Sequence, residues 1–381
     1  MNKAIDKIGA KEHNRTMSGA IFRYIAAAFL VVGIFLSSYT MTRAAEKIPV
    51  ILDTDMIDFF DDGVALMMLA KNDGVQLLGV TTVFGNNWEE NCTASALRQL
   101  ECIGRTDIPV YRGLNEPRRS SRFAAMENER KIFGAGTDIY NGLIDIKRPT
   151  SWQTAYKLNY EKEPQTSPAK ESAVDFLIKS VRERPHEITI VAIGSAANIA
   201  AAVNKDPQFA ANVKRIVYMG GTISAVGDAT PAAEFNFWID PESAKIALRA
   251  PFPEQIIFPL DVCKKIIYDY KTFSAFESRI KSADLKKMWD NQWYVNDFRE
   301  KKDQYHTYFW DVFTAAFVID SSVVTKEYTC FVDVNDVYSP SYGQLLAYKI
   351  NPPEGTQKAR IVTQADAKKI KAMLKNLFNE L

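Results

Sequence analysis

Five aspartates lie within ten residues, directly after a short apolar run. The run is Ile48 to Leu52, and the acids are Asp53, Asp55, Asp58, Asp61 and Asp62. Small and β-branched apolar residues in such a run predict a buried parallel strand, whose carboxyl end opens on the ligand cleft of α/β proteins. Carboxylates that converge there suit a hard divalent cation, Ca²⁺ or Mg²⁺. The alternative is a charged loop before the acidic first turn of a helix over 62–70, which the helix dipole would favour.

Two further segments have amide and carboxylate side chains that suit a polyol. Val83 to Asn87 predicts a strand end with two asparagines, Asn86 and Asn87, whose amides can bind sugar hydroxyls. They could instead cap a helix over 89–103. Glu234 and Asn236 are two residues apart, so on an extended segment they would share one face. Such alternation is also typical of any half-buried strand.

A fourth segment is Trp310-Asp311, which precedes the apolar stretch 312–319. An aspartate at the start of a helix is ordinarily an N-cap, and this is the alternative to a ligand role for Asp311.

Strand-like and helix-like segments alternate from Ile48 onward, which predicts an α/β fold with an open, mostly parallel sheet flanked by helices. The expected strands are 49–54, 75–84, 188–193, 215–219 and 255–260, and the expected helices are 62–71, 89–103, 169–183, 197–204 and 241–250. No linker divides residues 46–381, so we expect a single domain. Residues 113–167 are polar and irregular, as in a lid-like insertion. The aromatic-rich stretch 268–309 predicts a helical segment, in which Trp289, Trp293, Tyr294 and Phe298 are expected in the core. A small β element over 328–337, 345–350 and 359–362 is expected before a closing helix.

Composition excludes several classes of function. The formal net charge is +1 and no long basic block occurs. This argues against a nucleic-acid partner, because such binding needs basic patches that neutralise phosphates. The four cysteines match no zinc or redox spacing, and we expect buried thiols. The chain has only three histidines, which is too few to favour a histidine-rich metal site or a catalytic triad.

Residues 1–45 predict a secretory signal peptide. Arg15 and Arg23 precede an apolar stretch, Tyr24 to Leu36, and the small residues Ala44-Ala45 follow. A stretch of this length is short for a spanning helix, which needs about 20 residues. We expect export, to a periplasm or secreted; an uncleaved N-terminal membrane anchor is the alternative.

The motifs, taken in order, resemble the inosine-uridine-preferring nucleoside hydrolase family over nearly the whole region after residue 45. They are Asp53-Thr54-Asp55 with Asp61-Asp62, Phe84-Gly85-Asn86, 193–200, Met219-Gly220-Gly221, 230–236, 259–262 and Asp311 before a helix. The resemblance implies a nucleoside hydrolase fold with a Rossmann-like core. It also implies hydrolysis of the N-glycosidic bond of ribonucleosides, which releases base and ribose, and allows a homo-oligomer.

The family holds Ca²⁺ at the bottom of its pocket. The resemblance implies that the ligands are the carboxylates of Asp55, Asp62 and Asp311 and the backbone carbonyl of Ala197. Asp55 would also be the general base for a water on the cation, which lowers the pKa of that water. The implied ribose contacts are Asp61, Asn86 and Asn236, with Asp228 and Glu234 at the 5′ end. Asp53 would accept hydrogen bonds that orient the ligands.

Two departures from the family pattern concern the site. The loop 56–60 between the acidic pairs is two residues longer than the family's and lacks its glycine. Trp310 stands where many members have a histidine that protonates the leaving base; tryptophan can stack on a base instead, which favours purines. His306, Tyr305 and Tyr308 are close in sequence and could replace the acid, although a solvated role is expected for His306.

Other functions fit parts of the sequence. The longer loop and the insertion suggest a hydrolase of another ribosyl or glycosyl conjugate. A non-catalytic nucleoside- or sugar-binding protein would keep the pocket, but it would not require the base Asp55. Asp53-Thr54-Asp55 also matches the nucleophile motif of aspartate-based phosphotransferases, in which the 230–236 block has no role.

Export predicts a defined N-terminus. N-terminal sequencing of the mature protein should begin near Ala45 or Glu46, because a signal peptidase cuts after small residues. An intact Met1 or Met17 would contradict cleavage and favour an anchor or an unexported protein.

Overall fold

The computed structural model describes residues 46–135, 140 and 142–381. Within these, Lys47–Leu381 forms one compact unit. The predicted leader, 1–45, lies outside the described residues. No helix in the described part of the chain is long and apolar enough to span a bilayer.

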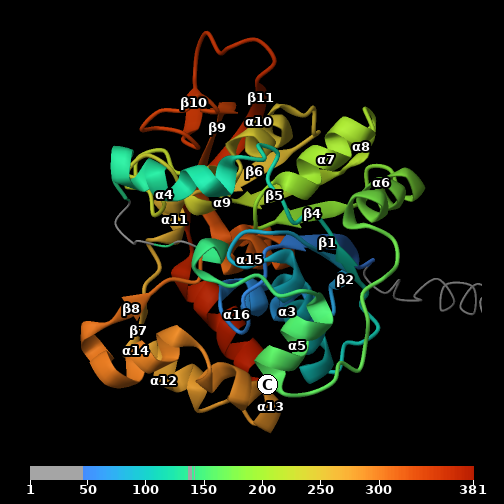
Figure 1. The fold of residues 1–381 in the computed structure, drawn as a ribbon, viewed down its shortest axis with the longest axis vertical. Coiled ribbons are helices and arrows are strands. Elements are labelled where there is room, and N and C mark those ends of the chain that lie inside the picture. Colours follow the sequence, from blue (N-terminus) through green and yellow to red (C-terminus); the bar gives the residue numbers. More distant parts are fainter. Residues whose placement is uncertain (1–45, 136–139, 141) are drawn as a thin grey trace, which may run out of the picture. The chain divides into compact units, whose positions relative to one another are not determined.

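The centre of the unit is a sheet of nine strands among the described residues, in the order β10-β9-β11-β6-β5-β4-β1-β2-β3 (Figure 1). The bounds are β1 (Ile48–Thr54), β2 (Val75–Thr82), β3 (Val110–Arg112), β4 (Thr189–Ala192), β5 (Arg215–Met219), β6 (Gln255–Phe258), β9 (Val324–Val334), β10 (Leu345–Tyr348) and β11 (Gln357–Ala365). From β11 to β3 all neighbours pair parallel, whereas β9 is antiparallel to both β11 and β10. The expected open, mostly parallel sheet is therefore confirmed.

Helices cover both faces of this sheet. One face packs α6 (Ala173–Glu183), α7 (Ala197–Lys205), α8 (Phe209–Asn212) and α10 (Pro241–Arg249), and the other α2 (Asp61–Lys71), α3 (Glu89–Cys102), α15 (Val312–Ile319) and α16 (Ala367–Asn379). Successive β1 residues alternate between the two cores: Val50 and Leu52 lie in one, and Ile51 in the other. A strand buried on both faces needs a continuous apolar run, which is what Ile48 to Leu52 supplies.

The two segments singled out in the sequence contain regular structure. The stretch 113–167 has α4 (Arg122–Phe133), η1 (Gly142–Asp145) and α5 (Trp152–Tyr160). The stretch 268–309 has α12 (Tyr270–Glu277), α13 (Ala283–Asp290), α14 (Trp293–Lys301) and η2 (Lys302–Gln304), with β7 (Tyr268–Asp269) paired to β8 (His306–Thr307). The remaining short elements are α9 (Phe235–Ile239), α11 (Leu260–Cys263) and η3 (Ser321–Val323).

Three expectations differ from the structure. The C-terminal strands do not form a separate small β element, because β11 pairs with β6 and so extends the main sheet. The edge strand β3 was not expected, since three residues are too few to show a pattern. Trp293 is 51% exposed, whereas Trp289, Tyr294 and Phe298 are buried in the core as expected.

The four cysteines are free thiols and three of them are buried, which confirms that expectation.

Candidate active site

The carboxyl ends of β2, β1, β4 and β5 meet at one edge of the sheet, beside a cavity of about 530 Å³. Asn86 follows β2, Ile193 follows β4 and Met219 ends β5, and all three line the cavity. Asp61 and Asp311 line it as well. A parallel sheet therefore brings the separated polar motifs of the sequence to one place.

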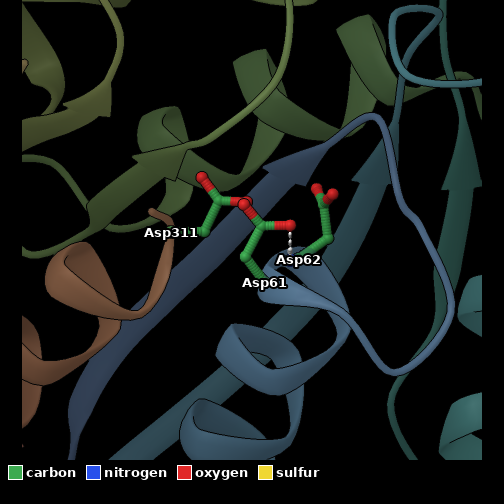
Figure 2. Close-up of side chains that lie close together, drawn as sticks. All are labelled: Asp61, Asp62 and Asp311. Atoms are coloured by element: carbon green, nitrogen blue, oxygen red, sulfur yellow. Dashed lines mark hydrogen bonds between the residues drawn. The ribbon is translucent and has the colours of Figure 1, made fainter. Parts of the chain in front are cut away.

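Three buried carboxylates gather at this edge. Oxygen atoms of Asp61, Asp62 and Asp311 lie within 4.8 Å of one another. Figure 2 shows their side chains directed into the same space, two from the first turn of α2 and one from the residue before α15. Asp311 occupies the N-cap position, yet its side chain makes no capping hydrogen bond. The simple cap interpretation of Asp311 is therefore wrong.

Asn86 joins Asp55 to this group. Its amide Nδ2 donates to Asp62 Oδ2 at 3.0 Å and to Asp55 Oδ1 at 3.2 Å, and its backbone N–H donates to Asp55 Oδ2 at 2.6 Å. Asp62 also accepts from Thr54 Oγ1 at 2.5 Å and from the backbone N–H of Ile57 at 3.3 Å. Asn86 is thus a bridge between carboxylates, whereas Asn87 accepts from Asn91 within α3.

Within the described residues, no ion pair with a lysine or arginine balances the carboxylates of Asp55, Asp61, Asp62 and Asp311. Burial is the largest cause that raises the pKa of Asp55, Asp61, Asp62 and Asp311, and other carboxylates of the group add to it for Asp55, Asp61 and Asp311. No lysine or arginine is among the largest causes of these four pKa shifts. Because an uncompensated buried charge costs several kcal/mol, a cation is the natural complement. A cluster of carboxylate oxygens fits the hard, oxygen-seeking Ca²⁺.

Asp53 lies one layer behind this group. It accepts hydrogen bonds from Thr81 Oγ1 at 2.5 Å and from Asn198 Nδ2 at 2.7 Å, and burial raises its pKa to about 6. Asn198 also donates to the carbonyl of Thr82 at the end of β2. These contacts tie β1, β2 and α7 together beneath the carboxylates, and they fit the positioning role expected for Asp53.

The sequence led us to expect Asp55, Asp62 and Asp311 as the clustered carboxylates, and the structure places Asp61 in that cluster as well. Asp61, expected to hold ribose, lies with Asp62 and Asp311, whereas Asp55 adjoins them through Asn86. Ala197 begins α7 and is buried, and which group its carbonyl binds stays a prediction.

The longer loop 56–60 explains where Asp61 lies, and three distant elements hold this loop. Tyr160 of α5 donates to Asp58 Oδ2 at 2.5 Å. The backbone N–H of Phe59 donates to Gln99 Oε1 at 2.8 Å, and Tyr294 of α14 donates to the Phe59 carbonyl at 2.7 Å. Phe59 has a φ of 44°, an unusual value for a bulky residue, which these bonds maintain. No sequence motif indicated this clamp, because its partners are far apart in the chain.

Glu234 and Asn236 do not lie on an extended segment, so that expectation is wrong. Glu234 caps the short helix α9, and its carboxylate accepts from the N–H groups of Asn236, Phe237 and Gly221 at 2.7, 3.2 and 2.7 Å. Asn236 lies inside the helix and donates from Nδ2 to the Ile193 carbonyl at 3.0 Å. Both still line the cavity, as does Asp228. Burial and Asp228 raise the pKa of Glu234 to about 8.

Aromatic side chains line another part of the cavity. Trp310 lies there with Tyr305, His306 and Tyr308. Tyr308 is 5.6 Å from Trp310 between ring centroids, and its Oη is 3.4 Å from His306 Nε2. His306 is exposed, as expected. Sequence reasoning missed Tyr140, Phe60 and Trp293 as cavity residues, because an aromatic residue alone does not show whether it faces a core or a ligand.

Comparison with known proteins agrees with this geometry. The sequence model of the family described as "Inosine-uridine preferring nucleoside hydrolase" matches residues 50–372. "Probable uridine nucleosidase 2" of Oryza sativa subsp. japonica is 38% identical over 209 residues, which are 54% of this chain and 56% of that protein. "Uridine nucleosidase 1" of Arabidopsis thaliana is 35% identical over 198 residues, 51% of this chain and 52% of that protein. The chain therefore spans about half the length of these curated relatives.

Solved structures cover more of the chain. "Plant nucleoside hydrolase - PpNRh1 enzyme" has a TM-score of 0.70 at 25% identity and covers 87% of this chain and 98% of that one. The "Purine-Preferring Ribonucleoside Hydrolase from Gardnerella vaginalis" shares the fold, with a TM-score of 0.67 at 23% identity over 87% of this chain and 99% of that one.

The carboxylate group predicts opposite effects of pH and of Ca²⁺ on stability. For Asp62 the pKa rises from 3.8 to about 6 on folding, so between these values the unfolded chain loses protons that the native state retains. Stability of the metal-free protein should therefore fall as pH rises through this window. Added Ca²⁺ should raise the melting temperature more at about pH 7.5 than at about pH 5, because it binds the ionised carboxylates. Differential scanning fluorimetry with EDTA or Ca²⁺ measures both effects.

Asp311→Asn provides the control for this measurement. It should raise the metal-free stability near neutral pH, since one buried charge is removed, and it should reduce the Ca²⁺-induced shift. An equal Ca²⁺ shift at both pH values, or none, would contradict the cation site.

Proposed function

Because the chain belongs to the inosine-uridine preferring nucleoside hydrolase family, we propose that it hydrolyses the N-glycosidic bond of ribonucleosides in a Ca²⁺-dependent reaction. The products are a free base and ribose. One observation carries the proposal: the buried carboxylates of Asp61 and Asp311 line a cavity whose other wall is aromatic, and Asp62 and Asp55 adjoin them. A ribose with its hydroxyls suits the acidic end, and a heteroaromatic base suits the aromatic end.

Asp55 is proposed as the general base. Its carboxylate is fully buried and is held by the backbone and side chain of Asn86. Burial and Asp62 raise its pKa, which is the direction that a base working near neutral pH requires. A bound Ca²⁺ would lower the pKa of a water among its ligands and would bind ribose hydroxyls. Asp55 would take a proton from the attacking water, whose oxygen bonds to C1′ as the bond from C1′ to the base breaks, and the anomeric centre would invert.

The acidic floor also suits the transition state. Cleavage of a glycosidic bond develops positive charge on the sugar, as in an oxocarbenium ion, and nearby carboxylates stabilise that charge. Asp61 and Asn86 are proposed to bind the 2′ and 3′ side of the ribose together with Asn236. Asp228 and Glu234 are proposed for the 5′ end. Asp228 would repel a 5′-phosphate, so nucleosides are favoured over nucleotides.

The base is proposed to stack on Trp310. The ring lines the cavity directly before Asp311, and its indole N–H has no hydrogen-bond partner. Stacking favours the larger ring system of a purine. The related proteins have names of both kinds, uridine nucleosidase and purine-preferring hydrolase. Tyr308 and His306 form a pair beside Trp310, and we propose that this pair passes a proton to the leaving base. We further propose that the protein acts after export.

Activity on a panel of ribonucleosides tests the function. Purified protein should release reducing sugar, and a Ca²⁺ chelator should abolish the release. Asp55→Ala should lower the rate by roughly two to four orders of magnitude, the range expected for loss of a general base. Asp73→Ala, at an exposed aspartate outside the cavity, is the matched control and should keep full activity. An active Asp55→Ala protein would remove the base assignment, and a folded, Ca²⁺-binding protein inactive on every nucleoside would sink the proposed reaction.

Trp310→Ala tests the stacking proposal. It should lower kcat/KM for purine nucleosides about tenfold more than for pyrimidine nucleosides, since purines lose the larger contact. Trp310→Phe keeps a ring and should restore part of the difference. Equal losses for both classes of base would exclude a stacking role.

A further inference from the structure

A line of three aromatic rings leads from the acidic floor to the surface of the molecule. Trp310 precedes Asp311 of the carboxylate group. The ring centroid of Phe60 lies 5.8 Å from that of Trp310 and also 5.8 Å from that of Trp293. All three residues line the cavity. Phe60 is therefore the link between an inner ring beside the acids and an outer ring at the surface.

Trp293 is the only member of the line that faces solvent to a large extent. It is 51% exposed, whereas Phe60 is 4% exposed. Its neighbour Tyr294 on α14 is fully buried and fixes the helix against the loop through the bond to the Phe59 carbonyl. At the edge of the cavity, this exposed ring offers apolar surface that a ligand can cover.

The chemistry of the wall around this line selects an uncharged, apolar ligand. Ile57, Phe60, Trp293 and Tyr305 contribute apolar or aromatic surface there. The acids Asp61, Asp228, Glu234 and Asp311 are the charged residues of the described cavity lining, in which neither lysine nor arginine occurs. A phosphate on the ligand would therefore meet no described lysine or arginine, whereas a planar hydrocarbon group would meet several rings.

We propose that Phe60 and Trp293 form an outer subsite that binds an apolar or aromatic substituent on the base of the substrate. The substrate class is then ribonucleosides whose base carries such a substituent, a refinement that rests on the proposed nucleoside hydrolysis. The inner ring, Trp310, contacts the base, and the outer rings contact the group that projects from it. The cavity volume of about 530 Å³ lies within the range of roughly 300–1,000 Å³ found for sites of drug-sized ligands.

The outer subsite is built from two segments that lie far apart in the sequence. Phe60 belongs to the longer loop between the acidic pairs, and Trp293 begins α14 in the helical segment 268–309. The clamp at Phe59 joins them, so the loop that positions Asp61 also positions Phe60. Tyr294 is accordingly a positioning residue for both the acids and the outer subsite.

Benzyladenosine, in which a benzyl group is attached to the exocyclic amine of adenosine, is the probe. The wild-type protein should show a kcat/KM for benzyladenosine about tenfold above that for adenosine, the gain expected for one added aromatic contact. Trp293→Ala should bring the ratio of the two constants close to one, and Trp293→Phe should retain part of it. Tyr338→Ala removes an exposed aromatic residue outside the cavity and is the matched control, which should keep the wild-type ratio.

A binding measurement separates this inference from the proposed reaction. Kd values for adenosine and benzyladenosine are measured by calorimetry with Ca²⁺ and Asp55→Asn protein, which keeps an oxygen ligand but loses the base, with and without Trp293→Ala. A preference for benzyladenosine that Trp293→Ala abolishes supports the subsite, even if no nucleoside is hydrolysed. A ratio that Trp293→Ala does not change, a preference for plain adenosine, or no binding of either compound would overturn it.

Discussion

The structure depends on the burial of four neighbouring carboxylates that form no ion pair with a lysine or arginine of the described residues. Asp55, Asp61, Asp62 and Asp311 are all at most 7% exposed, and burial raises the pKa of each. Taking an ionised carboxylate out of water costs several kcal/mol, so a fold that gathers four of them needs either protons or a cation. A cation bound beside these carboxylates would balance their charge, and the same negative charge can stabilise a developing cation on a sugar.

The α/β architecture explains how these carboxylates come together. Parallel strands end at one edge, so β1, β2 and the loops after β4 and β5 deliver their polar residues to the same place. The first turn of α2 contributes Asp61 and Asp62, where the positive end of the helix dipole offsets part of their charge. Asn86 fills the remaining space with donors to Asp55 and Asp62. Asp61 and Asp62 thus belong both to the first turn of α2 and to the proposed metal site.

The cavity is divided between an acidic floor and an aromatic wall, and the two parts come from different layers of the chain. Asp61 and Asp311 lie at the starts of two sheet-covering helices, whereas Trp293, Tyr305 and Tyr308 of the aromatic wall come from the segment 268–309. Tyr294 joins the layers because it donates to the carbonyl of Phe59 in the acidic loop. One hydrogen bond thus connects the helix that holds Trp293 with the loop that leads to Asp61 and Asp62.

Local pattern was enough to predict the parallel sheet, most strand and helix bounds and the acidic cluster, because apolar runs and charge density are properties of short segments. Tertiary structure alone decided that Asp311 turns from a cap toward the acids, that Asp61 lies among them, and that Trp293 faces the cavity while Tyr294 is buried. These outcomes depend on contacts such as Phe59 with Tyr294, which are 235 residues apart. Periodicity describes neighbours along the chain, whereas the direction of a side chain is set by whichever distant element packs against it.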